Sequence, residues 1–317
     1  MTRDINKLNM KNYFLLIILL LSVRTFAQDD LLSLVADSSK PGNEKVIATF
    51  KTSKIISAQS TETVKAKTLD FRITHRFGNA GTESNGGVHT LWGWDNSNDI
   101  RFSFDYGITD KIAIGVARNK MNELLDGSIK WRFLEQTKNN KVPFSAVVYS
   151  DMGITPEKEE QLYLGTVNVT RKFAHRISYT NQLVIARKFN SWLSFEVLPS
   201  YTHRNFVKNY INPDNNAVDE NDIFSIGVGG RIKLTKRFAI MADYFYIISD
   251  YRKNNSSIPY YNPLAIGCEI ETGGHVFHIN FTNASGINEN NFISNTTDTW
   301  TKGGYKFGFN ISRVFNL

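Results

Sequence analysis

The sequence "YKFGFNISRVFNL" (Tyr305–Leu317) decides the fold class of this chain. Alternate residues are mostly large and apolar, in the order Tyr305, Phe307, Phe309, Ile311, Arg313, Phe315 and Leu317. The residues between them are small or polar, apart from Val314. Because successive side chains of a β-strand point to opposite faces, the segment predicts a strand with one apolar and one polar face. The fold then depends on whether the apolar face meets a protein core or lipid.

The start of the chain predicts export. Basic residues precede the uncharged run "YFLLIILLL" (Tyr13–Leu21), and the small residues Thr25 and Ala27 follow it. This order is typical of a secretory signal peptide that is cleaved after Ala27. The run is too short for a transmembrane helix, which needs about 20 apolar residues. We therefore expect a signal peptide over residues 1–27, and no later segment is apolar enough for a spanning helix.

The composition is compatible with a membrane barrel and gives no support for a nucleic-acid partner. Aromatic residues make up 13% of the chain, with 22 Phe and 13 Tyr, as alternating strands with aromatic girdles would require. The single cysteine, Cys268, excludes an intrachain disulfide. The net charge of +7 is spread over the chain with both signs intermixed, which is typical of a solvated surface.

Period-2 runs recur from residue 68 to the C-terminus, and we count twelve of them, from "LDFRITHRF" to "GGYKFGFNISRVF". The connections between them alternate in length. The short ones lie at 108–112, 135–141, 188–192, 234–238 and 271–275. The others are mostly long and polar and lie at 78–99, 155–175, 207–222, 249–261 and 284–302, apart from a brief "KMNELL" link after the third strand. All tight turns then lie at one end of the structure, together with both chain ends. This parity is typical of an outer-membrane barrel with short periplasmic turns and long external loops.

Two segments leave alternatives open. Residues 161–173 have strong β-propensity, but a strand there would break the parity, so we assign them to an external loop. Residues 45–67 are basic and β-prone, and they could plug the lumen, extend the first hairpin or lie in the periplasm. The expected organisation is a signal peptide (1–27), a short periplasmic segment and linker (28–45) and a barrel domain (46–317), with its strands within 68–317.

The second face of the strands carries charged residues. A barrel in lipid turns its apolar set outward and its charged set into the lumen, whereas a soluble barrel needs an apolar interior. The signal peptide, the strand count and the last strand favour lipid. We therefore predict an all-β fold, an antiparallel transmembrane β-barrel of about 12 strands in the outer membrane. The candidate lumen-lining residues are Arg72, Arg101, Asp105, Lys130, Arg132, Glu196, Arg231, Asp243, Glu269 and Glu271.

Two ladders of ion pairs are expected among these residues. One would join Arg72, Arg101 and Asp105, and the other Lys130, Arg132 and Glu196. The interior of a barrel of about 12 strands is intermediate in width. Side chains fill a barrel of eight strands, whereas a barrel of about 16 strands contains an open channel. The sequence therefore leaves open whether the lumen is plugged or forms a pore.

The last strand resembles the C-terminal assembly signal of outer-membrane barrels. Its signal residues are Tyr305, Phe307, Phe309, Ile311 and Phe315. The barrel-insertion machinery reads such a strand, and the strand must pair with the first one because unpaired backbone groups are costly in hydrocarbon. Outer-membrane lipid and this machinery are the expected partners.

Several motifs occur in order along the chain: "HRFG" (75–78), "DYGITDKIAIG" (105–115), "QLVIARKF" (182–189), "PSYTHRN" (199–205), "ETGGHVFHINFTNASG" (271–286) and "FGFNISRVF" (307–315). With them, the chain from about Val46 to its C-terminus resembles an outer-membrane β-barrel family of the Bacteroidetes kind. The resemblance implies a barrel, and it implies no activity and no functional residues.

The sequence contains no strong catalytic or metal-binding pattern. His275 and His278 are three residues apart on an expected strand and so face opposite sides, as do Ser200 and His203. We therefore expect neither an enzyme nor a cofactor or metal. The expected function is a passive narrow pore for a small polar solute, or a structural component of the envelope. The alternatives are an outer-membrane enzyme of the lipase or protease type and a surface barrel for adhesion or partner binding.

Overall fold

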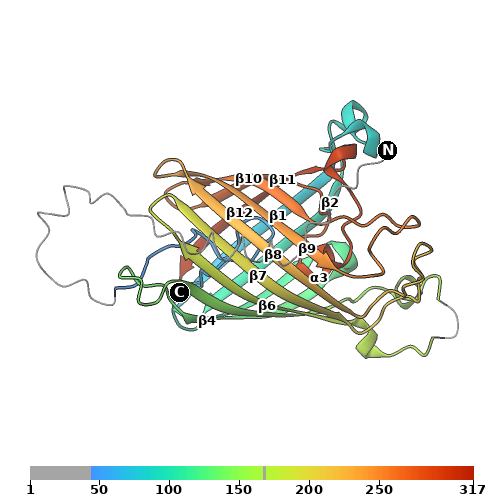
Figure 1. Cartoon of the computed structure of the whole chain (residues 1–317), viewed down its shortest axis with the longest axis horizontal. Helices are drawn as coiled ribbons and strands as arrows, with labels where there is room; N and C mark the ends of the chain where they lie inside the picture. Colours follow the sequence, from blue (N-terminus) through green and yellow to red (C-terminus); the bar gives the residue numbers. More distant parts are fainter. Residues whose placement is uncertain (1–43, 167–168) are drawn as a thin grey trace, which may run out of the picture. The chain divides into compact units, whose positions relative to one another are not determined.

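Twelve antiparallel strands close into a barrel in which each strand pairs with its neighbours in the sequence (Figure 1). The computed structural model describes residues 44–166 and 169–317. The expected signal peptide (1–27) and nearly all of the expected linker (28–45) lie outside these residues. The strands are β1 (Thr68–Asn79), β2 (Ser97–Gly107), β3 (Ile112–Asn119), β4 (Leu125–Leu134), β5 (Ser145–Ile154), β6 (Ile177–Lys188), β7 (Leu193–Arg204), β8 (Asp222–Lys233), β9 (Phe238–Ile248), β10 (Leu264–Glu271), β11 (Val276–Thr282) and β12 (Lys306–Asn316).

Over residues 44–166 and 169–317, helical structure is confined to short segments in the connections. The α-helices there are α2 (Glu159–Leu162) and α3 (Glu289–Ser294), and the 3-10 turns are η2 (Thr82–Ser84), η3 (Gly87–Thr90), η4 (Met121–Glu123), η5 (Phe173–Arg176) and η6 (Trp300–Lys302). Among the described residues, no helix is long and apolar enough to cross a membrane.

The last strand closes the barrel against the first. β1 and β12 pair from Thr68↔Asn316 to Asn79↔Lys306, with one irregularity at the Arg76/Asn79 end. Each edge therefore finds a backbone partner, as lipid requires. Four of the expected assembly residues, Phe307, Phe309, Ile311 and Phe315, lie within β12, and Tyr305 directly precedes it.

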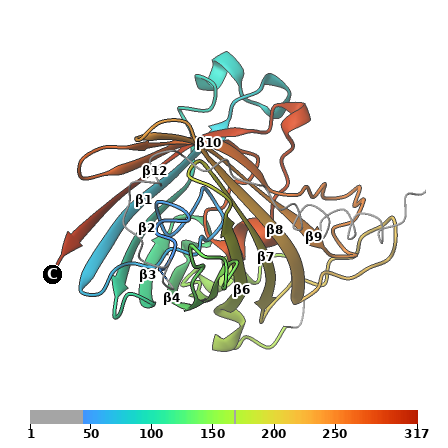
Figure 2. The ribbon, with the colours of Figure 1, turned by 60° about the vertical axis from the view of Figure 1, so that its left-hand side comes forward.

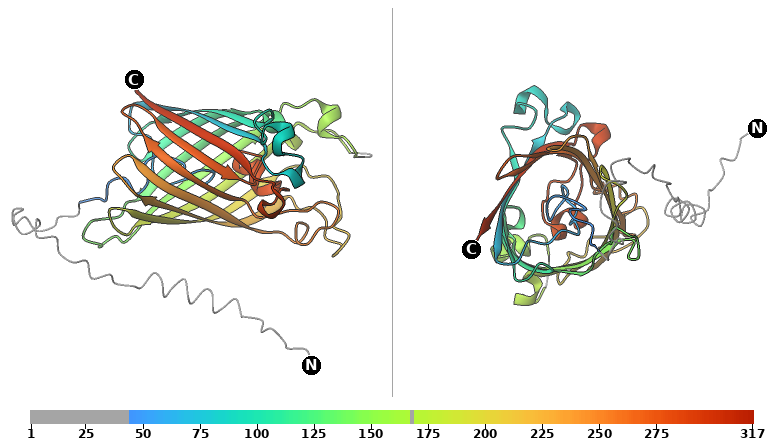
Figure 3. Two further views of the ribbon diagram at one scale, coloured as in Figure 1. Left: turned by 90° about the horizontal axis from the view of Figure 1, so that it is seen from above. Right: turned by 90° about the vertical axis from the view of Figure 1, so that its left-hand side faces the viewer.

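The alternation of short turns and longer connections is confirmed, and with it the count of twelve strands. Tight turns at 108–111, 189–192, 234–237 and 272–275 lie at the end opposite the long loops (Figure 3). The described part of residues 161–173 contains no strand, only the end of α2 and the start of η5. The loop assignment of this segment was therefore correct.

One long connection differs from the expectation of exposed external loops. Within residues 283–305, all six residues of α3 are buried, and Figure 2 shows this helix inside the ring of strands. Ala284, Ile287, Phe292 and Ile293 give the loop an apolar surface. Burying this surface against inward apolar residues of the strands is favourable.

Each strand has an outward apolar face and an inward face. β1 shows the alternation directly, since Thr68, Asp70, Arg72 and Thr74 are buried while the residues between them are half-buried. Outward residues elsewhere are large, apolar and exposed, among them Phe102, Phe104, Val116, Ile129, Trp131, Phe224 and Ile226. An exposed apolar belt on a closed barrel is the surface that lipid covers.

Candidate functional site

A segment ahead of β1 fills the middle of the lumen. Residues 49–61, called the plug below, are almost all buried, and the barrel surrounds them (Figure 3). The plug is a compact loop, because the backbone amide of Ile55 donates to Ala58 O (2.9 Å) and that of Ser60 to Ser53 O (2.9 Å). Of the three roles left open for residues 45–67, the structure therefore selects the plug.

One carboxylate of the wall binds the tip of the plug. Oδ2 of Asp243, in the middle of β9, accepts hydrogen bonds from the backbone amides of Ile56 (3.1 Å), Ser57 (2.8 Å) and Ala58 (3.1 Å). Three consecutive amides directed at one anion form an anion-binding concavity. Here the protein supplies both the anion and the concavity.

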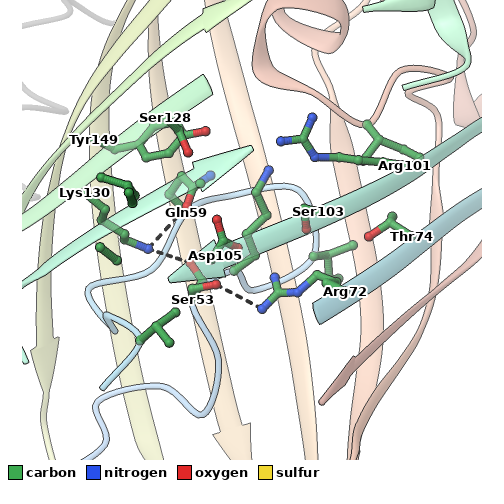
Figure 4. Close-up of a pocket in the computed structure, with 17 residues that line it drawn as sticks. Ser53, Gln59, Arg72, Thr74, Arg101, Ser103, Asp105, Ser128, Lys130 and Tyr149 are labelled. Carbon is green, nitrogen blue, oxygen red and sulfur yellow. Dashed lines mark hydrogen bonds between the residues drawn. The ribbon is translucent and has the colours of Figure 1, made fainter. Parts of the chain in front are cut away.

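Cations of the opposite wall bind the other side of the plug (Figure 4). Nζ of Lys130 donates to Ser53 O (2.7 Å) and to Oε1 of Gln59 (3.2 Å), and Nη2 of Arg72 donates to Oγ of Ser53 (3.0 Å). The lumen thus places a carboxylate against plug amides and cations against plug oxygens. This complementarity fixes the position of the plug across the barrel.

The plug also makes apolar contacts. Phe50, Ile55 and Ile56 cluster with Ala186, Met241 and Ala265, inward residues of β6, β9 and β10. Gly229 of β8 is required for this fit, since a Cβ there would lie 2.6 Å from Cδ1 of Ile55. The sequence analysis assigned only charged residues to the lumen and so missed this apolar wall.

The inward helix α3 forms the second part of the closure. Its Phe292 and Ile293 pack with inward apolar residues of five consecutive strands, namely Val147, Val184, Leu198, Ile223 and Phe245, and with Ala58 of the plug. Its Glu289 accepts hydrogen bonds from Nζ of Lys54 and Nε2 of Gln59, each at 2.9 Å. The plug and α3 therefore bind each other through one buried carboxylate.

The predicted lumen residues lie on the inward side but pair differently from the expected ladders. Arg72 pairs with Asp70 (3.1 Å) within β1, Arg101 of β2 pairs with Asp126 of β4, and Arg231 of β8 pairs with Glu269 of β10 (2.5 Å) and Glu271 (3.5 Å). Arg132 is close to Glu62 (3.6 Å) and Glu135 (3.7 Å).

The carboxylate of Asp105 lies over Gly115, where a Cβ would be 2.2 Å from Oδ1. The two ladders were wrong because pairing depends on side-chain reach across the lumen, which period-2 patterns do not encode.

The space left between the plug and the β1–β5 wall is small. This cavity measures about 30 Å³, and Figure 4 shows Arg72, Arg101, Asp105, Lys130 and Tyr149 around it. A water molecule needs at least about 10–15 Å³ on this measure, so the cavity holds on the order of two waters. In this conformation the cavity does not provide a solute path.

Two buried charged side chains lack adequate partners. Glu196 is completely buried, and neither carboxylate oxygen has a hydrogen-bond partner among the described residues. Arg76 is also completely buried, and its Nε and Nη2 have none there, while Nη1 makes only long contacts of 3.4 and 3.5 Å to His75 O and Asn310 Oδ1. Burying a charge without a partner is costly.

The residues considered for chemistry do not assemble into a site. Ser200 faces inward, where its hydroxyl bonds with Gln182 and Leu198 O, whereas His203 bonds with Asp222 (2.7 Å) at a partly exposed position. His278 is buried and His275 lies in the turn before it. No group of three or more His, Cys, Asp or Glu residues in the described ranges could hold a metal ion.

Comparison with known proteins identifies the fold family. The model of a membrane-bound β-barrel domain, DUF5777, matches residues 50–315. The chain belongs to this family. The match includes the plug as well as all twelve strands, so the plug is part of the family domain. Since barrels with short turns at one end and long loops at the other are of the outer-membrane type, the match confirms the predicted membrane barrel and its location in the outer membrane.

Solved structures similar to this DUF5777 barrel include outer-membrane porins. The NanC porin covers 78% of this chain and 99% of its own at 9% identity and a TM-score of 0.45. The KdgM porin covers 79% of this chain and 99% of its own, at 8% identity and a TM-score of 0.39. The outer membrane protein Omp33 of Acinetobacter baumannii covers 81% of this chain and 100% of its own, at 9% identity and a TM-score of 0.37. Scores this low carry no conclusion about function. No curated protein matches the chain.

Proposed function

We propose that this barrel is a narrow pore for small polar solutes that the plug and α3 keep closed. The observation that carries the proposal is that side chains suited to line an open lumen, Asp243, Lys130 and Arg72, are occupied by the plug of the same chain. Hydrogen bonds to charged groups contribute about 1.5–3 kcal/mol each in net terms. None of them belongs to the strand pairing, so the plug can leave without breaking the pairing of the barrel strands.

Two buried ionisable groups support an opening transition. With the plug in place, Glu196 has no hydrogen-bond partner among the described residues, and Arg76 has only two long contacts. Water that enters an opened lumen would solvate both groups and offset part of the free energy lost with the plug contacts. A permanently sealed structural barrel would gain stability from apolar residues at these positions, since replacing buried ionic groups by well-packed apolar ones is often stabilising.

A structural role in the envelope is the second candidate, and the observation that favours it is the close packing of the lumen by the plug and α3. We assign the barrel no catalytic role. In support, the serine and histidine considered above point to different sides of β7 and bind other partners.

Single-channel recording in planar bilayers tests the pore. The natural protein should give rare or no conductance steps, whereas Asp243→Ala should give frequent discrete steps because the plug loses three hydrogen bonds. Asp95→Ala, in an exposed turn of the first external loop, is the matched control and should behave like the natural protein. In the Asp243→Ala background, Arg101→Glu should shift the ion preference toward cations.

Folding of each variant is checked by heat-modifiable migration on gels. If Asp243→Ala, and also the double variant Asp243→Ala/Glu289→Ala, are folded and electrically silent, the pore is refuted and the structural role is favoured. A natural protein that is already fully open would refute closure by the plug.

A further inference from the structure

A second hollow lies among the long loops at the end of the barrel opposite the tight turns. It measures about 430 Å³, and it is distinct from the small cavity beside the plug. Its walls come from the β3–β4, β5–β6, β7–β8 and β9–β10 connections, and Asn290, Asn291 and Ser294 of α3 contribute to its lining. Loops that are distant in sequence thus converge on one concave surface, the outer hollow.

Basic side chains outnumber acidic ones around the outer hollow. Arg176, Arg204, Lys208 and Arg252 line it, with Glu157 and Asp219 as the only lining carboxylates. Arg204 and Arg252 share the same carboxylate oxygen, Oδ1 of Asp219, at 2.8 and 3.0 Å. Two further carboxylates lie near the lining, since Glu220 reaches Arg252 at 3.1 Å and Glu123 is close to Glu157, so the excess of cations is confined to the lining itself.

Two of the four cations form no salt bridge with a carboxylate in the described part of the chain. Nη1 of Arg176 donates to the backbone oxygens of Thr155 (3.1 Å) and Glu157 (2.5 Å). The ammonium group of Lys208 makes no hydrogen bond there and interacts with the Glu157 carboxylate only at longer range, as does Arg176. In addition, Nε of Arg204 is buried and has no partner there. The ammonium group of Lys208 and Nε of Arg204 can therefore still donate to an anion.

The lining carboxyl of Glu157 faces an environment that favours its neutral form. Burial, followed by the nearby Glu123, raises the pKa of Glu157, and together they outweigh the opposite effect of Lys208 and Arg176. Its carboxyl therefore carries less negative charge in mildly acidic solution than an ordinary glutamate would. This further increases the positive potential of the hollow.

The remaining lining suits the body of a small organic molecule. Phe206, Tyr210 and Tyr260 supply aromatic surface, and the side-chain amides of Asn122 and Asn295 add polar groups. Small-molecule sites combine apolar and aromatic surface with a small number of polar groups that orient the ligand. A bare inorganic ion would leave most of this volume and surface unused.

We propose that the outer hollow binds a small organic anion with one or two carboxylates. Lys208 and Arg176 would pair with the anionic groups, and the aromatic and amide side chains would contact the carbon body. Because this site lies in the loops, binding does not require the plug to move. The inference is therefore independent of the proposed pore.

Isothermal titration calorimetry on the full detergent-purified barrel tests the site with succinate, its neutral isostere succinamide, and inorganic phosphate. Succinate should bind, and succinamide should bind at least about tenfold more weakly, as expected for the loss of a charge-assisted hydrogen bond. Phosphate should bind more weakly than succinate, since it makes no use of the aromatic walls.

Lys208→Gln should lower succinate affinity about tenfold. Lys236→Gln, in the β8–β9 turn at the other end of the barrel, is the matched control and should leave the affinity unchanged. Because the ammonium group of Lys208 makes no hydrogen bond or salt bridge within the described residues, the folded barrel should be intact, which heat-modifiable migration verifies. Four results would each overturn the proposal. They are equal binding of succinate and succinamide, no succinate binding at millimolar concentration, unchanged succinate affinity in Lys208→Gln, and tighter binding of phosphate than of succinate.

Discussion

Oδ2 of Asp243 accepts a hydrogen bond of 2.8 Å from the backbone amide of Ser57, although the two residues are 186 positions apart in the chain. The contact joins the middle of β9 to the tip of the plug. It places a buried carboxylate of the wall against the plug inside the lumen. The state of the lumen therefore depends on a small number of polar contacts between the wall and the plug.

Loss of this carboxylate should make the plug dynamic before it affects the barrel. In Asp243→Ala, amide hydrogen exchange over residues 49–61 should accelerate strongly, while exchange in the strands should remain slow. Exchange reports local opening, and the plug would lose three hydrogen bonds to a charged acceptor, each worth about 1.5–3 kcal/mol. Asp95→Ala serves as the control. Unchanged exchange in the plug would show that apolar contacts alone keep it in place.

The apolar side of the lumen should contribute stability in the manner of a soluble protein core. Phe292 of α3 is fully buried and packs edge-to-face against Phe245 of β9, with ring centroids 5.0 Å apart. Phe292→Ala should lower the free energy of unfolding by about 3–5 kcal/mol. Phe224→Ala removes the same atoms from an outward position that is 56% exposed and should cost much less. Urea unfolding in lipid vesicles measures both, and equal losses would argue against a packed lumen.

The outward aromatic residues of β12 should matter for assembly. Phe315→Asp places a charge on the lipid-facing side of the closing strand, and we expect lower amounts of folded protein in the membrane with unchanged synthesis. Phe173→Asp makes the same change in an external loop, at a residue that is 69% exposed, and should assemble normally. Quantitative blotting of membrane fractions gives the answer. Deletion of residues 307–317 should abolish insertion, and normal levels of that protein would refute the role of β12.

The parity of the connections fixes the sidedness. Single cysteines in a Cys268→Ala background should react with a membrane-impermeant thiol reagent in intact cells at Asn85 and Asn215, both exposed in long loops, and not at Lys236 in a tight turn. Its place in a long polar loop suggests that Asn290 would also be labelled. Asn290 is unsuitable for this test, however, because it belongs to α3 and is buried. Labelling at Lys236 without Asn215 would mean that the barrel is inserted in the opposite sense.

The sequence by itself determined the barrel. Side chains alternate with a period of two along any strand, so the apolar and polar faces, the number of strands and the closing role of β12 follow from local pattern. The lengths of the connections can also be read from the sequence. Because they alternate, the short and long connections lie at opposite ends of the barrel. Even the pairing of β1 with β12 follows, because lipid tolerates no open edge.

Only the tertiary structure decided what fills the barrel. The plug and α3 have no periodic pattern, and their positions depend on contacts across the lumen, such as Glu289 with Lys54 and Asp243 with Ser57. Period-2 patterns place a residue on a face and do not specify which residues it meets there. Arg101 therefore pairs with Asp126 rather than with its expected neighbours, and Val147, Leu198 and Phe245 form an apolar core inside a lumen that was expected to be charged. Inside the closed barrel, the length, volume and charge of each side chain decide which other side chains it contacts. These contacts join distant segments, so no single segment of the sequence specifies them.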